Sequence, residues 1–391
     1  MSNTYIKKVH GIIDNVIFHH YPSYISYFLQ QHLDMYMSGY HDYGGYHKFV
    51  IQNQFFTLLH QQADESFTQQ SYEEFYKNAY SKKMILTDVN FAAVAKSLNI
   101  KYETFRRCKL EMAKEGWFEF GSNTVEFTRK LIDKRSARHK LYITSHASYL
   151  HSILKLIAKY FDITLSIPDA KSIEEKLKEY YENSILDYSN FTKNFINHWT
   201  EKLFDSFESY VVFHIIFLNQ IRRIDYENDK RGLGLDFNTM EDHFYDIPPP
   251  FAMSASSIAE SCGFSRSTVT RHLARLEKKN LIIKLGNLNN KTRSTLAKNY
   301  PLSYNPSTKD RLSKDSSGIN KILGGQKSYL IKGNTKAISE RTNIRKVIFH
   351  MKVNFLTKQF IRLNLLTEEN LEQIATSKIR FTHPTQAYDG R

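Results

Sequence analysis

Cationic side chains recur along one face of a predicted helix that begins after Ser265. Three apolar residues of this segment, Val269, Leu273 and Leu276, recur at helical spacing and are expected to face inward. The positions left on the outside carry hydroxyl and guanidinium groups and are Arg266, Ser267, Thr270, Arg271 and Arg275. Guanidinium groups bind phosphate oxygens and the acceptor edge of guanine, so this face has the chemistry of a nucleic-acid-binding surface.

Capping and turn residues predict the elements that position this helix. Ser254 is a good N-cap for a short preceding helix, which is expected to end where Gly263 can take a positive φ. Ser265 then caps the second helix. Asn280, a residue tolerated in the left-handed conformation, is expected to end it. Two helices joined by a tight turn are therefore expected.

A two-stranded hairpin is predicted directly after the second helix. Residues 281–283 begin a strand, a tip rich in turn-forming residues follows at 286–291, and the second strand is expected at 292–296. Together with the string SRSTVTRHLARLEKKNLI from Ser265, this order resembles the winged helix-turn-helix of MarR-type and GntR-type bacterial transcription regulators. The resemblance covers about a tenth of the chain.

The resemblance implies which side chains touch DNA. The second helix of such a motif enters the major groove, and the hairpin, or wing, follows the backbone. The residues expected to face the groove are Arg266, Ser267, Thr268, Thr270 and Arg271. Phosphate contacts are expected from the helix end and the wing, at Arg275, Lys284, Asn289, Lys291 and Arg293.

The positive charge of the chain is concentrated around this motif. The formal net charge is +14, from 54 Lys and Arg against 40 Asp and Glu. Residues 266–362 hold 22 of the basic residues and four acids, a net of +18, which leaves −4 for the remainder. A local basic window on an otherwise slightly acidic chain is typical of a polyanion-binding surface, because polyphosphates release condensed counterions to concentrated Lys and Arg.

The same pattern recurs 164 residues earlier without a gap. It starts at Asn90, which matches the cap Ser254, and it carries Asn99 where the other copy has Gly263 and Gly116 where that copy has Asn280. Positions that need a left-handed residue thus hold Gly or Asn in both copies. The counterparts of the groove-facing residues are Tyr102, Glu103, Thr104, Arg106 and Arg107.

The first copy departs from the pattern at several positions. Lys101 replaces the capping serine, Lys109 replaces the inward Leu273, and Glu103 repels phosphate although it can accept from cytosine. The hairpin expected at 117–127 is short and carries two glutamates. Direct DNA contact is therefore expected from the second copy more than from the first, which is alternatively a dimerisation or protein-docking module.

These features predict a mainly α fold with small β-wings (α+β). Two tandem winged helix-turn-helix domains are embedded in aromatic-rich helices and are followed by a basic helical extension. The expected domains are residues 1–135, 136–305 and 306–391, with a polar linker at 130–140. An amphipathic cationic helix is predicted at 338–365 after a loop-like stretch that follows Pro301.

Several function classes are not indicated. No HExxH, Walker-type or GxGxxG motif is present, so we expect no enzyme, no cofactor and no metal, and we interpret the histidines at 19, 20, 41 and 47 as packing or surface residues. Cys108 and Cys262 are interpreted as core residues more readily than as a redox pair. The longest apolar stretch, 210–218, is too short to span a membrane, and a cytoplasmic, nucleoid-associated protein is expected.

The function these observations favour is sequence-specific binding of double-stranded DNA by a transcription regulator. The alternatives are a replication initiator of plasmid or phage type and a non-catalytic winged-helix scaffold that docks proteins. A homodimer is left open, and so is a small-molecule effector, for which the aromatic stretches at 21–46 and 180–199 offer lining residues.

Overall fold

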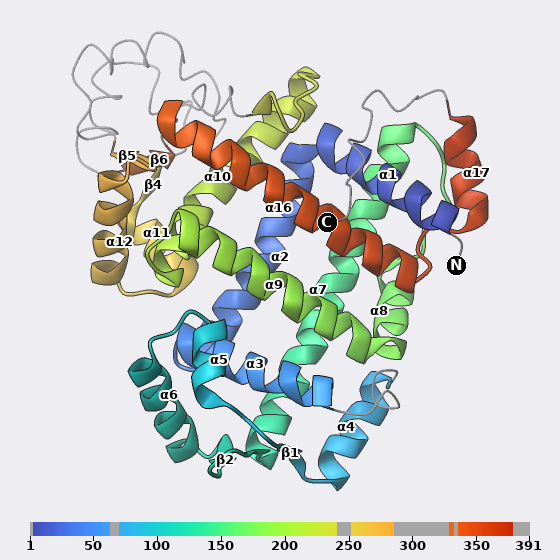
Figure 1. The fold of residues 1–391 in the computed structure, drawn as a ribbon. Helices are drawn as coiled ribbons and strands as arrows, with labels where there is room; N and C mark the ends of the chain where they lie inside the picture. Colours follow the sequence, from blue (N-terminus) through green and yellow to red (C-terminus); the bar gives the residue numbers. More distant parts are fainter. Residues whose placement is uncertain (1–2, 63–69, 241–251, 285–327, 332–334, 378–391) are drawn as a thin grey trace. The chain divides into compact units, whose positions relative to one another are not determined.

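The computed structural model of the chain describes residues 3–62, 70–240, 252–284, 328–331 and 335–377 (Figure 1). Its contacts divide the chain into two compact units, each discontinuous in sequence. Unit 1 comprises Met1–Ile17, Asp34–His198 and Lys346–Arg391, and unit 2 comprises Phe18–Leu33 and Trp199–Arg345. The described residues are predominantly helical with two small three-stranded sheets, so the predicted mainly α fold with small β elements is confirmed at this level.

Unit 1 contains a helix-turn-helix with a three-stranded sheet, set among longer helices. Its elements, some of which extend into unit 2, are α1 (Asn3–His19), α2 (Tyr21–Asp42), α3 (Tyr46–Gln62), α4 (Tyr72–Ser81), β1 (Met84–Leu86), α5 (Phe91–Ser97), α6 (Tyr102–Lys114), β2 (Phe118–Phe120), β3 (Val125–Phe127), α7 (Arg129–Phe161), α8 (Ala170–Glu179), α9 (Tyr181–Lys202), α16 (Thr335–Arg362) and α17 (Glu368–Thr376). The sheet is antiparallel in the order β1-β3-β2. Phe55 of α3 packs against Phe105 of α6 and Phe118 of β2, which fixes the motif on α3.

Unit 2 holds the basic helix-turn-helix. Its elements are α10 (Phe207–Arg231), β4 (Met253–Ser254), α11 (Ala255–Cys262), α12 (Arg266–Lys278), β5 (Ile282–Lys284) and β6 (Ser328–Ile331). The strands form an antiparallel sheet in the order β4-β6-β5, with Met253 opposite Tyr329 and Ile282 opposite Ile331. Helices α11 and α12 pack on α10, whose buried face includes Val211, Ile215 and Leu218.

The predicted hairpin of the second copy is described only at its first strand, β5. The partner of β5 is β6 at Ser328–Ile331, and β6 also pairs with β4. The return strand predicted at 292–296 lies outside the described residues, as do the tip at 286–291 and the loop-like stretch after Pro301. The central strand of this sheet is therefore supplied from farther along the chain, because β6 offers both of its edges and joins β4 to β5.

The prediction of a linker at 130–140 was wrong. These residues lie inside α7, a 33-residue helix that begins after the cap Thr128 and ends at Asp162, whose φ is +51°. Arg135 and Arg138 are buried there because their guanidinium groups bond inside unit 1, Arg135 to the side chain of Asn53 and Arg138 to the carbonyl of residue 35. The compact units accordingly do not follow the three consecutive segments 1–135, 136–305 and 306–391.

The predicted C-terminal helix is present as α16, but within unit 1 it is not a free cationic surface. Ile348, Val353 and Phe360 are buried, and the side chain of Lys352 is buried with them. Arg362 forms an ion pair with Asp187 of α9. One face of this part of the helix therefore belongs to a core, and the charges of Lys352 and Arg362 are used within the fold, whereas Lys346 and Lys358 are exposed.

Among the described helices, none is both long enough and apolar enough to cross a bilayer.

Candidate nucleic-acid interface

The helix-turn-helix of unit 2 is built by the capping residues that its sequence predicts. The Ser254 hydroxyl accepts from the backbone N–H of residue 257 at 3.1 Å, and Ser265 accepts from that of residue 268 at 3.1 Å. Gly263 ends α11 with a φ of +66° and Asn280 follows α12 with a φ of +56°. Each predicted cap and left-handed residue of this copy is thereby confirmed.

The inner face of α12 is anchored by three apolar residues and one histidine. Val269, Leu273 and Leu276 are completely buried, as predicted. His272 is buried as well, and its Nδ1 lies 2.8 Å from the hydroxyl of Ser209 at the start of α10. Burial lowers the pKa of His272, so the ring is neutral at pH 7 and adds no charge to the helix. The sequence reasoning missed His272, although the spacing 269, 272, 273, 276 places it on the inward stripe.

The outer face of α12 presents the predicted cations to solvent. The exposed residues of the predicted set are Arg266, Ser267, Thr270, Arg271 and Arg275. None of the three arginines has a carboxylate partner in the part of the chain that the structure describes. Thr268 differs from its prediction, because it is half-buried and its hydroxyl accepts from Ser265 at 2.9 Å within the N-cap. The hydroxyl of Thr268 is therefore engaged in the N-cap of α12, and its predicted contact with the groove is secondary to that role.

A lysine that the sequence reasoning also missed fixes the far end of α12. The ammonium of Lys279 donates to the carbonyl of Leu203 at 3.1 Å and lies 2.5 Å from the carboxylate of Asp205. Both partners belong to the segment between α9 and α10, within unit 2. No local pattern gives this contact, because it joins residues more than 70 positions apart. Together, His272 fixes the middle of α12 to the start of α10, and Lys279 fixes its C-terminal end to the segment before α10.

The predicted wing residues are described only in part. Lys284 is the last residue of β5 and is half-buried. Asn289, Lys291 and Arg293 lie outside the described residues. The expected phosphate contacts of the wing therefore stay a prediction.

The motif of unit 1 has the same order of elements and the same backbone signals. Asn90 caps α5 through the N–H of residue 93 at 3.0 Å, and Asn99 and Gly116 have φ values of +52° and +71°. The N–H of Trp117 bonds to the carbonyl of residue 112 at 3.0 Å, as Leu281 bonds to residue 276 at 2.9 Å. Lys101 makes no side-chain cap, as its sequence indicates. The two motifs agree in their local geometry.

Their outer faces differ in charge pairing. Tyr102, Arg106 and Arg107 of α6 are exposed and Thr104 is half-buried. The guanidinium of Arg106 binds the carboxylate of Glu103 through two hydrogen bonds of 2.8 Å, and this bidentate pair lowers the pKa of Glu103. Arg107 lies 4.0 Å from the carboxylate of residue 111. The cations of α6 are thus partly neutralised by its own acids.

Lys109 occupies the position of unit 1 that matches the buried Leu273 of unit 2. Its ammonium lies 3.8 Å from the centre of the Phe91 ring and 5.0 Å from that of Phe120. A cation over the faces of two rings is stabilised electrostatically while its stem packs against them. The aromatic residues of unit 1 therefore accommodate a charge at a position that is apolar in unit 2.

The structure describes the two cysteines and residues of the types that could ligate a metal. Cys108 and Cys262 are free and buried, and burial raises the pKa of both thiols. This agrees with their interpretation as core residues. No cluster of three or more His, Cys, Asp or Glu among the described residues could hold a metal ion.

One comparison with known proteins identifies a family-level likeness. The model of the MarR family matches residues 251–293, which include α11, α12 and β5. No curated protein and no solved structure matches the chain. The match supports a winged-helix regulator motif at this one site, and it does not include the motif of unit 1.

Proposed function

We propose that the chain is a sequence-specific double-stranded DNA-binding protein, a transcription regulator, in which α12 enters the major groove. The observation that carries the proposal is the outer face of α12. Arg266, Arg271 and Arg275 are exposed on it without carboxylate partners in the described residues, on a helix within the MarR match. Arginine is the side chain that most often reads guanine in the major groove, and unpaired guanidinium groups need not break an ion pair first.

We further propose that the motif of unit 1 is a second winged helix with a different task. Its backbone signals support this assignment, since Asn99 and Gly116 take the left-handed conformations that the same positions take in unit 2. Its outer face favours a weaker role on DNA, because Arg106 is already bound to Glu103. A protein-docking role for this motif is the second candidate, favoured by the exposed side chains of Tyr102 and Leu110 on the same helix.

The first experiment is selection of bound fragments from fragmented genomic DNA, followed by affinity measurements on the enriched site. We expect Arg271→Ala to weaken specific binding by about 1–3 kcal/mol and to change non-specific affinity little. Arg106→Ala is expected to have a smaller effect because its charge is paired. The control for a general loss of positive charge is Arg231→Ala at the far end of α10, which removes an exposed guanidinium that pairs with Glu227.

The outcomes separate the candidates. Enrichment at many promoter sites supports a regulator, whereas one cluster of repeats favours a replication initiator. If Arg271→Ala weakens binding to all sequences equally, Arg271 contacts phosphate and the base-reading role is wrong. If no fragment is enriched over input, DNA binding is rejected and both motifs become protein-docking candidates.

A further inference from the structure

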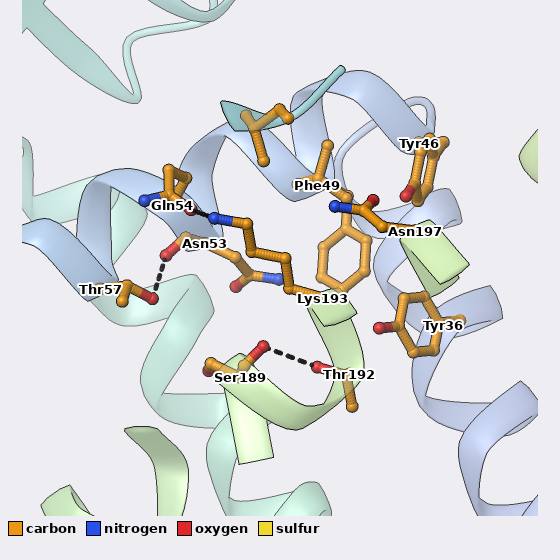
Figure 2. Close-up of a pocket in the computed structure, with 12 residues that line it drawn as sticks. Tyr36, Tyr46, Phe49, Asn53, Gln54, Thr57, Ser189, Thr192, Lys193 and Asn197 are labelled. Carbon is orange, nitrogen blue, oxygen red and sulfur yellow. Dashed lines mark hydrogen bonds between the residues drawn. The ribbon is translucent and has the colours of Figure 1, made fainter. Parts of the chain in front are cut away.

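A pocket in unit 1 lies between helices α3 and α9, beside the helix-turn-helix of that unit (Figure 2). One wall is apolar and includes Phe49 of α3 and Leu98, the residue that ends α5. The other wall is polar and is formed by Asn53 and Gln54 of α3 with Ser189 and Lys193 of α9. The remaining lining residues are Tyr36, Tyr46, Val50, Thr57, Thr192 and Asn197.

Lys193 brings a positive charge into this pocket. Figure 2 shows its side chain reaching across from α9 to α3, where the ammonium donates to the side-chain carbonyl of Gln54 at 2.8 Å. The residue is half-buried, and burial lowers its pKa. Among the described residues no carboxylate forms an ion pair with Lys193. The two acids on the unit 1 part of α9 have other partners, since Glu182 is held by His60 and Asp187 by Arg362.

A second cation lies behind the same wall. Arg135 of α7 is buried, and its guanidinium donates to the side-chain oxygen of Asn53 at 3.0 Å. It too has no carboxylate partner among the described residues. Two cations thus bind neutral amides at one end of the pocket. Buried charges are ordinarily paired, since an isolated charge loses its hydration without compensation.

Donors at the pocket wall remain available for a ligand. Within the described residues, the amide nitrogens of Asn53 and Gln54 and the hydroxyl of Ser189 donate no hydrogen bond. The cavity has a volume of about 40 Å³. One ordered water needs roughly 10–15 Å³ of such cavity volume, so the pocket holds about three water-sized groups. A ligand of a few heavy atoms fits, and a negative charge on it would compensate the ammonium of Lys193.

We propose that this pocket binds a small oxyanion, a carboxylate or phosphate of a few heavy atoms, with Lys193 as its principal charged contact. The amide and hydroxyl donors complete the coordination, and the apolar wall with Leu98 contacts the rest of the ligand. Since Leu98 ends the first helix of the helix-turn-helix, an occupied pocket restrains that turn against α3. The site lies in unit 1, and its test does not rest on DNA binding by α12.

Equilibrium dialysis of the full-length protein with radiolabelled acetate and, separately, phosphate tests the proposal, with chloride keeping the ionic strength constant and no DNA present. We expect saturable binding of about one equivalent of at least one anion. Lys193→Met should weaken it by about tenfold or more, because a charge-assisted contact is lost, and Lys193→Arg should retain most of it. Lys155→Met on the exposed side of α7 is the matched control and should bind normally.

Two further readouts locate the anion. Hydrogen exchange of the amides at 98–100 should slow on anion addition. Binding of the anion to a lysine elsewhere on the surface would not slow this exchange. In the wild-type protein, the anion should protect Lys193 from acylation relative to Lys155, so the test does not depend on the Lys193→Met variant folding. Binding of acetate alone identifies a carboxylate site, and binding of phosphate alone identifies a phosphate site. Absence of saturable binding, or binding that survives Lys193→Met unchanged, overturns the proposal.

Discussion

We predict that charge exchange at two matched inner positions destabilises the two units unequally. Leu273 of α12 is completely buried, so Leu273→Lys forfeits roughly 1.5–3 kcal/mol of apolar burial. It also places an ammonium where the residues matching Phe91 and Phe120 are Ala255 and Lys284, neither of which offers a ring. With the cost of burying an unpaired charge, the free energy of unfolding of unit 2 should fall by more than about 4 kcal/mol.

The reverse exchange in unit 1 should be nearly neutral. Lys109→Leu removes a cation that lies over two rings, an interaction of about 0.5–1 kcal/mol at a partly exposed site. The leucine then buries its own apolar surface against the same rings, which offsets the loss. The net change should stay within about 1 kcal/mol.

The two tryptophans of the chain allow each unit to be followed separately. Trp117 belongs to unit 1 and Trp199 to unit 2, and both are buried. Urea unfolding is monitored by fluorescence in Trp199→Phe and Trp117→Phe backgrounds, and each exchange is compared with its own background. If Leu273→Lys shifts the unfolding midpoint of unit 2 no more than Lys109→Leu shifts that of unit 1, the ring-based account of Lys109 is refuted.

Two further perturbations test the buried histidines and the tight turns. Burial lowers the pKa of His146 in unit 1 from 6.5 to about 3, so its contribution to stability is complete above pH 6.5 and is lost as the pH falls from there toward 3. Between pH 6.5 and 5 the loss of unfolding free energy from this histidine amounts to about 2 kcal/mol. His146→Phe should therefore make the urea midpoint of unit 1 less sensitive to acid. An unchanged sensitivity would contradict the assignment of a lowered pKa to His146. Gly263→Ala should destabilise unit 2 by about 1–2 kcal/mol because its φ is +66°, whereas Asn280→Gly should be tolerated, and similar losses in both would speak against the conformational explanation.

Local features of the helix-turn-helix could be predicted because they depend on near neighbours. A cap such as Ser265 bonds to a backbone N–H three residues away, and a left-handed residue such as Asn99 is favoured by its own side chain. The inner and outer faces of α12 follow from the helical period alone. These signals need no knowledge of the rest of the fold, and they gave both helices and the exposed arginines.

Long-range features had no comparable signal. Strand β6 pairs with β5, although residues 285–327 separate the two in the sequence. Strands of three or four residues carry too little sequence pattern for such a distant pairing to be predicted. The linker expected at 130–140 is a helix because Arg135 and Arg138 find buried partners on α3 and α2. Lys193 was missed for the same reason, since its partner Gln54 is 139 residues away.

The two helix-turn-helix motifs separate what determines a fold from what determines a surface. Their left-handed turns and backbone bonds agree, yet the arginines of α12 have no carboxylate partner in the described chain while Arg106 of α6 is held by Glu103. The backbone gives both helices the same local geometry, but their cations differ. Only an unpaired cation can displace counterions from DNA phosphates without first losing an ion pair. Under the proposed function, reducing the charge pairing of α6 therefore affects any DNA contact of this helix more directly than a change to its backbone. The Glu103→Gln substitution isolates that effect, because it keeps the side-chain shape and removes the competing carboxylate.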